Sequence, residues 1–308
     1  MASREDIITG TSYLKGGTMF RKTYPALLII PALLPLCLFI LFPAINTLYM
    51  SFHKVTYGAS DLFVGIKNYT KLLDSNVFKL ALVHTITYSI AIVILEISFS
   101  LGVSLLINTK FPFKKVIVSL IMMPYAVSEV VAVIIFQLLF STDTGIVNYL
   151  ISFVSQSMGK ISWFTNPKLL WVVIVLIQIW ISYPFSFLLI YSALICIPQE
   201  LYEAASIDGA GKIAMFRYII LPTIRPVLLL ATSFRLIFAF REFSTVWILT
   251  KGGPANATEL LSSLLYKQAF QYNEFGLASA TSIVMLIITI VLSLSYFSLM
   301  FKKEKKGI

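Results

Sequence analysis

Long uninterrupted runs of apolar residues, separated by short polar segments, make up most of this chain. Six runs reach the length of about 20 residues that a helix needs to cross a bilayer core. They cover residues 25–48, 82–107, 115–140, 169–196, 226–249 and 277–301. The runs are rich in Leu, Ile, Val and Phe and lack period-2 alternation. The pattern therefore predicts an all-α integral membrane protein with about six transmembrane helices.

Composition agrees with this class, since 58% of the 308 residues are hydrophobic and only 12% are charged. Soluble domains are about half apolar and a quarter charged. The first run follows basic residues, as a signal peptide does, but it is about twice the usual length and no small-residue cleavage site follows it. We therefore interpret residues 25–48 as a retained span.

Basic residues near the span ends indicate the orientation, because short loops rich in Lys and Arg stay in the cytoplasm. With the N-terminus inside, the cytosolic segments hold 14 Lys and Arg residues and the outer loops hold 8. Both termini are therefore expected in the cytosol, as segment 1–24 and the basic tail 302–308. The net charge of +10 gathers beside span ends rather than along one helical face, so nucleic acid is not an expected partner.

No motif for catalysis, metal binding or nucleotide binding stands out. A G-x-x-x-x-G-K-[ST] loop is missing, so the chain is not expected to bind ATP or any other cofactor itself. His53 and His84 lack metal-ligand spacing, and Cys37 and Cys196 lie in apolar sequence, where buried free thiols are expected. These observations disfavour a membrane enzyme and leave a carrier or a translocation subunit.

The polar segment 197–222, between the fourth and fifth runs, predicts a cytosolic helical hairpin. Pro198 suits a first helical turn, and the helix is expected to end near Ile207. Gly209 permits the left-handed backbone that reverses the chain. A second helix is expected over 212–220, ended by Leu221-Pro222. Small alanines and spaced apolar residues give the hairpin a face that suits a protein partner.

The spacing Glu203-Ala204-Ala205, three residues, Gly209, nine residues, Ile219-x-Leu221-Pro222 resembles the EAA loop of permease subunits of bacterial ABC importers. Flanking residues resemble the maltose-type, carbohydrate-importing branch of this family, over about residues 25–300. The matching positions are Gly65, Asn68-Tyr69, Pro124, Gly145, Asn148, Trp180, Ile197-Pro198, Gly252-Gly253-Pro254 and Thr258-Glu259.

The resemblance implies a type I ABC importer fold in a bacterial cytoplasmic membrane, with segment 197–222 as the coupling loop. A cytosolic ATPase dimer would bind ATP and Mg²⁺, and a lipid-anchored or periplasmic solute-binding protein would deliver an oligosaccharide. A second, homologous permease would complete the pore. Larger relatives carry additional spans and an outer insertion that this chain lacks. The implied ATPase-docking residues are Glu203, Ala204, Ala205, Asp208, Gly209 and Phe216.

Ionisable residues inside the spans are costly in a membrane and are therefore candidate functional groups. The chain has Glu96, Glu129, Arg235, Arg241 and Glu242. Arg235 lies about 14 Å along a helix that starts at Pro226, and a continuous helix would put Glu242 on the same face two turns further. One interpretation is internal pairing of Arg235 with Glu96 or Glu129. The other is that an arginine binds a substrate carboxylate, as in uronate-containing oligosaccharides.

Aromatic residues at similar depth are candidates for stacking on sugar rings, although packing is their commoner role. The substrate-path candidates are Tyr125, Glu129, Tyr183, Phe187, Arg235, Arg241, Glu242 and Trp247. The alternative function is a proton-coupled secondary sugar carrier with Glu96 and Glu129 as a relay. Such a carrier does not need the 197–222 hairpin and usually shows internal repeats, which this sequence does not.

Overall fold

The computed structural model describes residues 31, 33–56, 58, 61–109, 112–154 and 160–304, with side chains as far as residue 298. The expected N-terminal segment 1–24 and most of the basic tail 302–308 lie outside this part. Five helices are long and apolar enough to cross a membrane, and a bent pair makes up to six. The prediction of about six spans is therefore confirmed.

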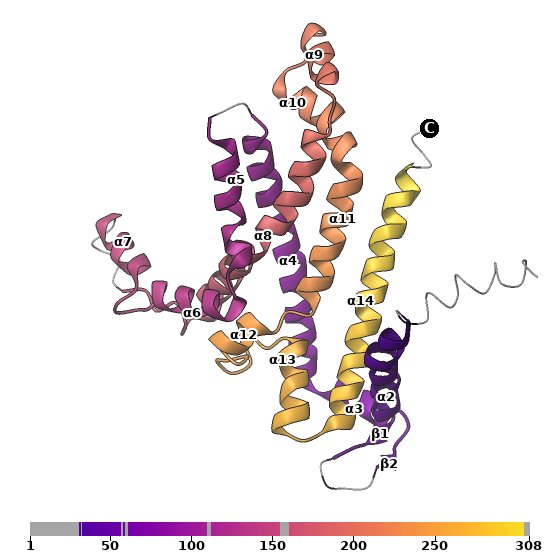
Figure 1. Ribbon diagram of the computed structural model, residues 1–308. Coiled ribbons are helices and arrows are strands. Elements are labelled where there is room, and N and C mark those ends of the chain that lie inside the picture. Colours follow the sequence, from indigo (N-terminus) through magenta and orange to yellow (C-terminus); the bar gives the residue numbers. More distant parts are fainter. Residues whose placement is uncertain are drawn as a thin grey trace, which may run out of the picture.

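The single-helix spans form an elongated bundle (Figure 1). The first span covers Leu33–Ser51 and includes α2 (Phe42–Ser51). The second and fourth are α4 (Asn76–Ile107) and α8 (Pro167–Ile195), and the last is α14 (Phe275–Glu304). Cys37 and Cys196 are free and exposed, so the expectation of buried thiols was wrong. Both side chains therefore lie on the surface of the described part of the chain.

The third predicted span, 115–140, does not cross as one straight helix. It consists of α5 (Lys114–Met122), a 3₁₀ turn at Met123–Ala126 and α6 (Glu129–Leu139), and its two halves meet at 97°. Pro124 lies in the turn, where it cannot donate a backbone hydrogen bond, and Ser128 before α6 is extended (φ −60°, ψ 136°). The apolar run is continuous in the sequence, but the helix axis changes direction within it.

The fifth predicted span, 226–249, begins earlier than expected and is interrupted. The helix starts with α10 (Lys212–Met215), passes through a π-helical turn at Phe216–Ile220, and continues as α11 (Leu221–Phe240). Leu221-Pro222 therefore does not end the helix. The wider π turn accommodates Pro222 within the helix, and the Leu221 N–H donates to the carbonyl of Phe216.

A second interruption separates α11 from α12 (Ser244–Leu249). Arg241 (φ −104°, ψ 16°) and Phe243 (φ −136°, ψ −50°) leave helical geometry there. The prediction that Glu242 lies two helical turns above Arg235 on one face was wrong, because the helix ends between the two residues.

The centre of the bundle is the pair α4 and α8, which pack along most of their length. Small residues of α4 allow this approach: the hydroxyls of Ser100 and Ser104 donate to the backbone carbonyls of Tyr183 and Phe187 on α8, at 3.2 and 3.4 Å. Buried apolar layers above and below include Ile92 with Ile174, and Leu194 with Ile224.

Short elements close one end of the bundle. The strands β1 (His53–Lys54) and β2 (Leu62–Phe63) pair antiparallel, with His53 opposite Phe63, and are followed by α3 (Lys67–Asp74). Helix α13 (Leu261–Tyr266) and a π-helical turn at Lys267–Gln271 lie at the same end, whereas α9 (Gln199–Ile207) and α10 lie at the opposite end (Figure 1). Helix α7 (Ile146–Val154) projects sideways from the bundle.

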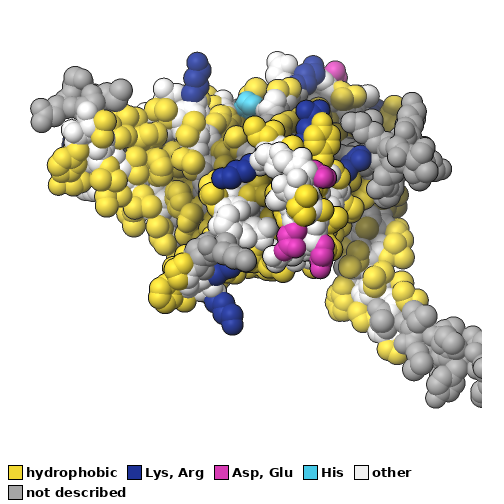
Figure 2. Space-filling model, turned by 90° about the horizontal axis from the view of Figure 1, so that it is seen from above, with side chains coloured by type: hydrophobic (Ala, Val, Ile, Leu, Met, Phe, Trp, Pro, Cys, Tyr) yellow, Lys and Arg dark blue, Asp and Glu magenta, His cyan; other side chains and the backbone are white. Residues whose placement is uncertain are grey.

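Figure 2 views the molecule from the end that carries α9 and α10. Asp and Glu side chains gather over the hairpin, and Lys and Arg side chains surround it. This end includes Lys114, Lys115, Lys212, Arg217 and Arg225, as the cytosolic assignment requires. The lobe on the side of α7 is almost entirely hydrophobic.

Candidate functional site

A cavity of about 410 Å³ lies where the two interrupted spans meet α8. Its walls come from the α5–α6 bend, from α8 and from the α11–α12 break, so both departures from straight helices serve to shape it. Five of the predicted substrate-path residues line this cavity: Tyr125, Glu129, Arg235, Arg241 and Glu242. These five residues come from the third and fifth predicted spans, and α8 supplies further residues of the wall.

Arg235 is paired with Glu96 of α4. The Arg235 Nε and Glu96 Oε2 atoms lie 2.8 Å apart, and the side chains are only 6% and 0% exposed. The contact is an ion pair rather than a hydrogen bond of standard geometry. Of the two interpretations of Arg235, internal pairing with Glu96 is the one observed. A buried charge needs such a partner, because desolvation of an isolated guanidinium is prohibitive.

A polar network built on Gln178 joins three helices beside this pair. The Gln178 amide on α8 donates to Glu129 Oε1 at 2.9 Å and to the Thr245 hydroxyl at 2.7 Å. Thr245 also bonds Glu129 Oε1 at 3.2 Å, and its backbone N–H donates to Glu242 Oε1 at 3.0 Å. The two carboxylates on the cavity wall are therefore held by amide and hydroxyl groups from α8 and α12.

Arg241 differs from the other charges of the cavity because it is exposed and has no carboxylate within ion-pair distance in the described part of the chain. Its guanidinium carbon lies 5.1 Å from the centre of the Phe238 ring, a cation–π contact. Glu129 and Glu242 line the same cavity but are engaged with Thr245 and Gln178. The free guanidinium is thus open to whatever occupies the cavity.

Three predicted path residues lie elsewhere. Tyr183 packs edge-on against Phe99, with ring centres 5.1 Å apart, and Phe187 is fully buried and stacked on Tyr191. Trp247 packs against the ring of Tyr266, 4.5 Å away. These aromatic side chains hold helices together, and none lines the cavity.

Sequence reasoning missed several residues of the cavity wall, namely Gln178, Ile181, Ser182, Phe185, Ser186, Phe238, Phe243 and Ser244. Gln178 carried a usable signal, since it is an amide in the middle of a long apolar run. The apolar and aromatic residues of the wall could not be recognised from the sequence, because similar residues recur on every face of the same helices.

The predicted hairpin at 197–222 is present, although its second helix continues past Pro222. Helix α9 spans Gln199–Ile207 with Pro198 at its N-cap, and Gly209 has the left-handed φ of 73° that reverses the chain. Ile207 and Ile213 are 86% and 83% exposed, so an apolar face is open as expected. Ala205, however, is only 8% exposed and packs within the chain, so it does not belong to that face.

The other predicted docking residues, Glu203, Ala204, Asp208 and Gly209, are exposed, and Phe216 is half-buried. Beside α9 lies a second cavity of about 660 Å³, lined in part by Lys114, Tyr202 and Glu203. Burial raises the pKa of the Tyr202 hydroxyl above its ordinary value.

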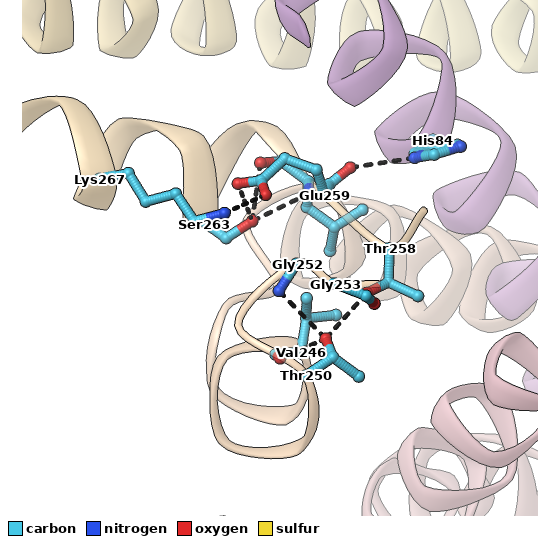
Figure 3. Close-up of polar contacts among 10 residues, drawn as sticks. His84, Val246, Thr250, Gly252, Gly253, Thr258, Glu259, Ser263 and Lys267 are labelled. Atoms are coloured by element: carbon cyan, nitrogen blue, oxygen red, sulfur yellow. Dashed lines mark hydrogen bonds and ion pairs between the residues drawn. The ribbon is translucent and has the colours of Figure 1, made fainter. Parts of the chain in front are cut away.

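The Gly252-Gly253-Pro254 turn has a structural role (Figure 3). Gly252 has a φ of 84°, and a Cβ there would overlap the Glu259 carboxylate. Glu259 is fully buried, forms an ion pair with Lys267, and accepts from the Ser263 hydroxyl at 3.0 Å. Thr258 donates to the Gly253 carbonyl at 2.7 Å. The motif therefore folds the turn tightly around a buried charge pair.

A bundle of apolar spans around a polar cavity defines a multi-pass membrane transport protein. Residues 97–302 match the family model of the binding-protein-dependent transport system inner membrane component. The chain belongs to this family and is a membrane permease subunit. The expected family is thereby confirmed.

Two relatives illustrate the match. The chain is 32% identical to the trehalose/maltose transport system permease protein MalF of Thermococcus litoralis, covering 88% of this chain and 91% of that one. It is 31% identical to the sulfoquinovosyl glycerol transport system permease protein SmoG of Agrobacterium fabrum, covering 90% of each.

Among solved structures, the chain resembles a subunit of a bacterial ABC transporter involved in the import of the acidic polysaccharide alginate. The TM-score is 0.80 at 21% identity, covering 91% of this chain and 96% of that one. At this identity the similarity establishes the fold, which is that of a type I ABC importer permease, as expected.

Proposed function

We propose that this permease is the transmembrane subunit of an ATP-driven importer that moves a sugar or oligosaccharide across a bacterial cytoplasmic membrane by alternating access. The observation that carries the proposal is the cavity between the spans, which combines aromatic rings with carboxylate, amide, hydroxyl and guanidinium groups. Two relatives of more than 30% identity carry names that refer to sugar or sugar-glycerol transport.

The chemistry of the cavity suits a sugar. Carboxylates of Glu129 and Glu242 accept hydrogen bonds from hydroxyl groups, and the Arg241 guanidinium donates them. The rings of Tyr125 and Phe243 offer apolar faces on which a pyranose packs. No catalytic residue is assigned, since each of these side chains is a binding group for a substrate in passage.

Arg241 is the residue to which we assign recognition of an acidic group, if the substrate is uronate-containing. Arg235 is neutralised by Glu96, so it has no free charge to offer. Arg241 has no carboxylate partner among the described residues, and guanidinium binds carboxylates bidentately. A neutral oligosaccharide would use the same guanidinium as a hydroxyl donor, so the two substrate classes differ in how strongly they depend on this residue.

We further propose that a cytosolic ATPase dimer, which binds ATP and Mg²⁺, docks on the hairpin around α9. The exposed Ile207 and Ile213 and the small side chain of Ala204 support this, because they form an apolar face outside the spans. Gly209 sets the turn that presents them. An extracytoplasmic binding protein, periplasmic or lipid-anchored, would dock at the opposite end, and a homologous second permease (the companion permease) would complete the pore.

The proton-coupled carrier loses its main support in this structure. A relay through Glu96 and Glu129 requires carboxylates free to exchange protons, but Glu96 is fully buried against Arg235 and Glu129 is bound by Gln178 and Thr245. The family assignment also favours import that depends on a binding protein.

Reconstitution tests the proposal. The permease would be placed in liposomes with a companion permease, an ATPase and a binding protein, and uptake of labelled sugars and ATP hydrolysis would be measured together. We expect sugar-loaded binding protein to stimulate both activities. Uptake driven by a proton gradient without the ATPase would overturn the proposal.

A further inference from the structure

Helix α9 and the ends of two spans border the cavity of about 660 Å³ at the end assigned to the cytosol. Its wall includes Asn108, directly after α4, Ile195 at the end of α8, and Lys114, the first residue of α5. Figure 1 shows the α4–α5 turn and α9 at the same end of the bundle. The cavity therefore lies at the level where the spans leave the membrane. Its volume is in the range of about 300–1,000 Å³ that small-ligand sites have.

Two opposite charges line this cavity without pairing. Lys114 is half-buried, and no carboxylate of the described residues lies within ion-pair distance of it. Its ammonium lies 5.3 Å from the centre of the Tyr191 ring, a contact that leaves N–H donors for a ligand. Glu203 accepts from the Gln199 amide at 2.9 Å and has no cationic partner in the described segments. One cation and one anion on the same wall suit a zwitterion, whose two charges can each form a charge-assisted hydrogen bond.

The span side of the cavity wall is apolar and reaches the outer surface of the bundle. Leu194, Ile195 and Ile197 line the cavity there, and Ile195 is 57% exposed. Leu106, two residues before Asn108 on α4, is also exposed. In a membrane, exposed apolar side chains at the end of a span contact acyl chains. A ligand with an apolar chain would therefore cover this part of the wall, whereas a small soluble zwitterion would not.

We propose that this cavity binds the headgroup of phosphatidylethanolamine, a phospholipid with a primary ammonium, from the cytosolic leaflet. The phosphate contacts Lys114, the ammonium contacts Glu203, and the acyl chains lie along Ile195. Basic pockets at the cytoplasmic ends of transmembrane helices recognise lipid headgroups through the same phosphate chemistry. The bound lipid would join α9 to the ends of α4, α5 and α8. The inference goes beyond the proposed function, because this lipid is not a transported substrate.

Native mass spectrometry of the full-length permease, extracted in detergent and stripped of its own lipid, tests the binding. Dioleoyl forms of phosphatidylethanolamine, phosphatidylglycerol and phosphatidylcholine would be added in turn. We expect one molecule of phosphatidylethanolamine to bind about fivefold or more tightly than either other lipid. Phosphatidylglycerol lacks the cation that meets Glu203, and the quaternary ammonium of phosphatidylcholine cannot donate a hydrogen bond to a carboxylate. Equal affinity for the three lipids would overturn the inference.

Lys114→Gln tests the phosphate contact. The matched control is Lys115→Gln, which removes the same charge from the next residue of α5, outside the cavity wall. We expect the affinity for phosphatidylethanolamine to fall about fivefold for Lys114→Gln, which corresponds to about 1 kcal/mol, and to stay unchanged for Lys115→Gln. The thermal unfolding temperature of both variants should match that of the unaltered chain. If both variants lost affinity equally, the lipid would be held by the general positive charge of this end and not by the cavity.

Glu203→Gln tests the ammonium contact through selectivity, a ratio that a general loss of folded protein does not change. Glu200→Gln is the control, since Glu200 lies on the same helix outside the cavity wall. We expect the preference for phosphatidylethanolamine over phosphatidylglycerol to fall to about one for Glu203→Gln and to persist for Glu200→Gln. A preference that survives Glu203→Gln would contradict the assignment of the ammonium and with it the proposed site.

Soluble phosphoethanolamine separates a lipid from a free zwitterion. It carries the same two charged groups without acyl chains, so it cannot cover the apolar wall at Ile195. We expect it to bind at least about tenfold more weakly than the lipid, because it buries less apolar surface. Displacement of the lipid by phosphoethanolamine at the same concentration would assign the cavity to a soluble ligand and overturn the inference. These measurements use the permease without an ATPase, so their outcome does not depend on the proposed function.

Discussion

Arg235 and Arg241 stand six positions apart in the same span, yet they lie in opposite environments. Arg235 is buried with Glu96 in a closed ion pair between α11 and α4. Arg241 lies at the break that follows α11, exposed to the cavity, with the Phe238 ring against it. The comparison shows that a charge within a span is structural when another helix supplies its counterion and becomes available for binding where the helix ends.

Gln178 connects the two regions. Its amide nitrogen holds Glu129 and Thr245 on the cavity side, and its carbonyl oxygen accepts from Arg235 Nη2 at 3.4 Å on the closed side. A change in the closed pair can therefore reach the cavity wall through one side chain. Four substitutions separate the contributions of these residues.

The largest effect is expected from Glu96→Gln, which leaves Arg235 buried without a counterion. Breaking a buried pair in this way costs about 3–5 kcal/mol of folding free energy. We expect little folded protein, measured as the yield and thermal unfolding temperature of the detergent-extracted permease. The exposed Glu200→Gln serves as the control. A yield equal to that of the unaltered chain would show that the pair is not needed for folding.

Gln178→Leu is expected to have the next largest effect. It removes the donor shared by Glu129 and Thr245, and leaving buried polar groups unsatisfied costs about 1–3 kcal/mol. We expect a lower unfolding temperature together with reduced transport, because the cavity wall and the closed pair both lose a partner. If stability alone fell, the cavity wall would not depend on Gln178.

Arg241→Gln is expected to leave folding unchanged, because the guanidinium is exposed and no carboxylate in the described segments lies within ion-pair distance of it. The effect should appear in transport: uptake of an oligouronate should fall about tenfold or more, since charge-assisted hydrogen bonds contribute about 1.5–3 kcal/mol, while uptake of its neutral counterpart should change much less. Arg241→Lys should restore part of the activity. Equal loss for both sugars would exclude recognition of an acidic group by Arg241.

Ser182→Ala is expected to have the smallest effect. The Ser182 hydroxyl lines the cavity and contacts Gln178 Oε1 only at 3.4 Å, which is a weak hydrogen bond. Its removal should change the free energy of unfolding by no more than about 0.5 kcal/mol. A transport defect at normal stability would instead show that this hydroxyl contacts the substrate.

Features encoded locally were predictable from the sequence. The spans follow from the length of apolar runs, and α9 with its turn follows from Pro198 and Gly209. The bend in the third span was not predicted, although Pro124 stands at it, because apolar length indicates that a segment lies in the membrane and not in which direction it runs. The π turn that allows the helix to continue past Pro222 was missed for a related reason. The free-energy cost of a proline in a helix depends on the backbone conformation around it.

By itself, the sequence determined the class of protein, the number of spans, the position of the hairpin and a short set of charged residues in the membrane. Only the tertiary structure decided the partners of these charged groups. Arg235 pairs with Glu96, and Glu129 and Glu242 accept hydrogen bonds from Gln178 and Thr245. The Arg241 side chain is exposed to the cavity. The physical reason is distance. Hydropathy and turn signals act within a few residues, whereas ion pairs and cavity walls join side chains from spans far apart in the chain.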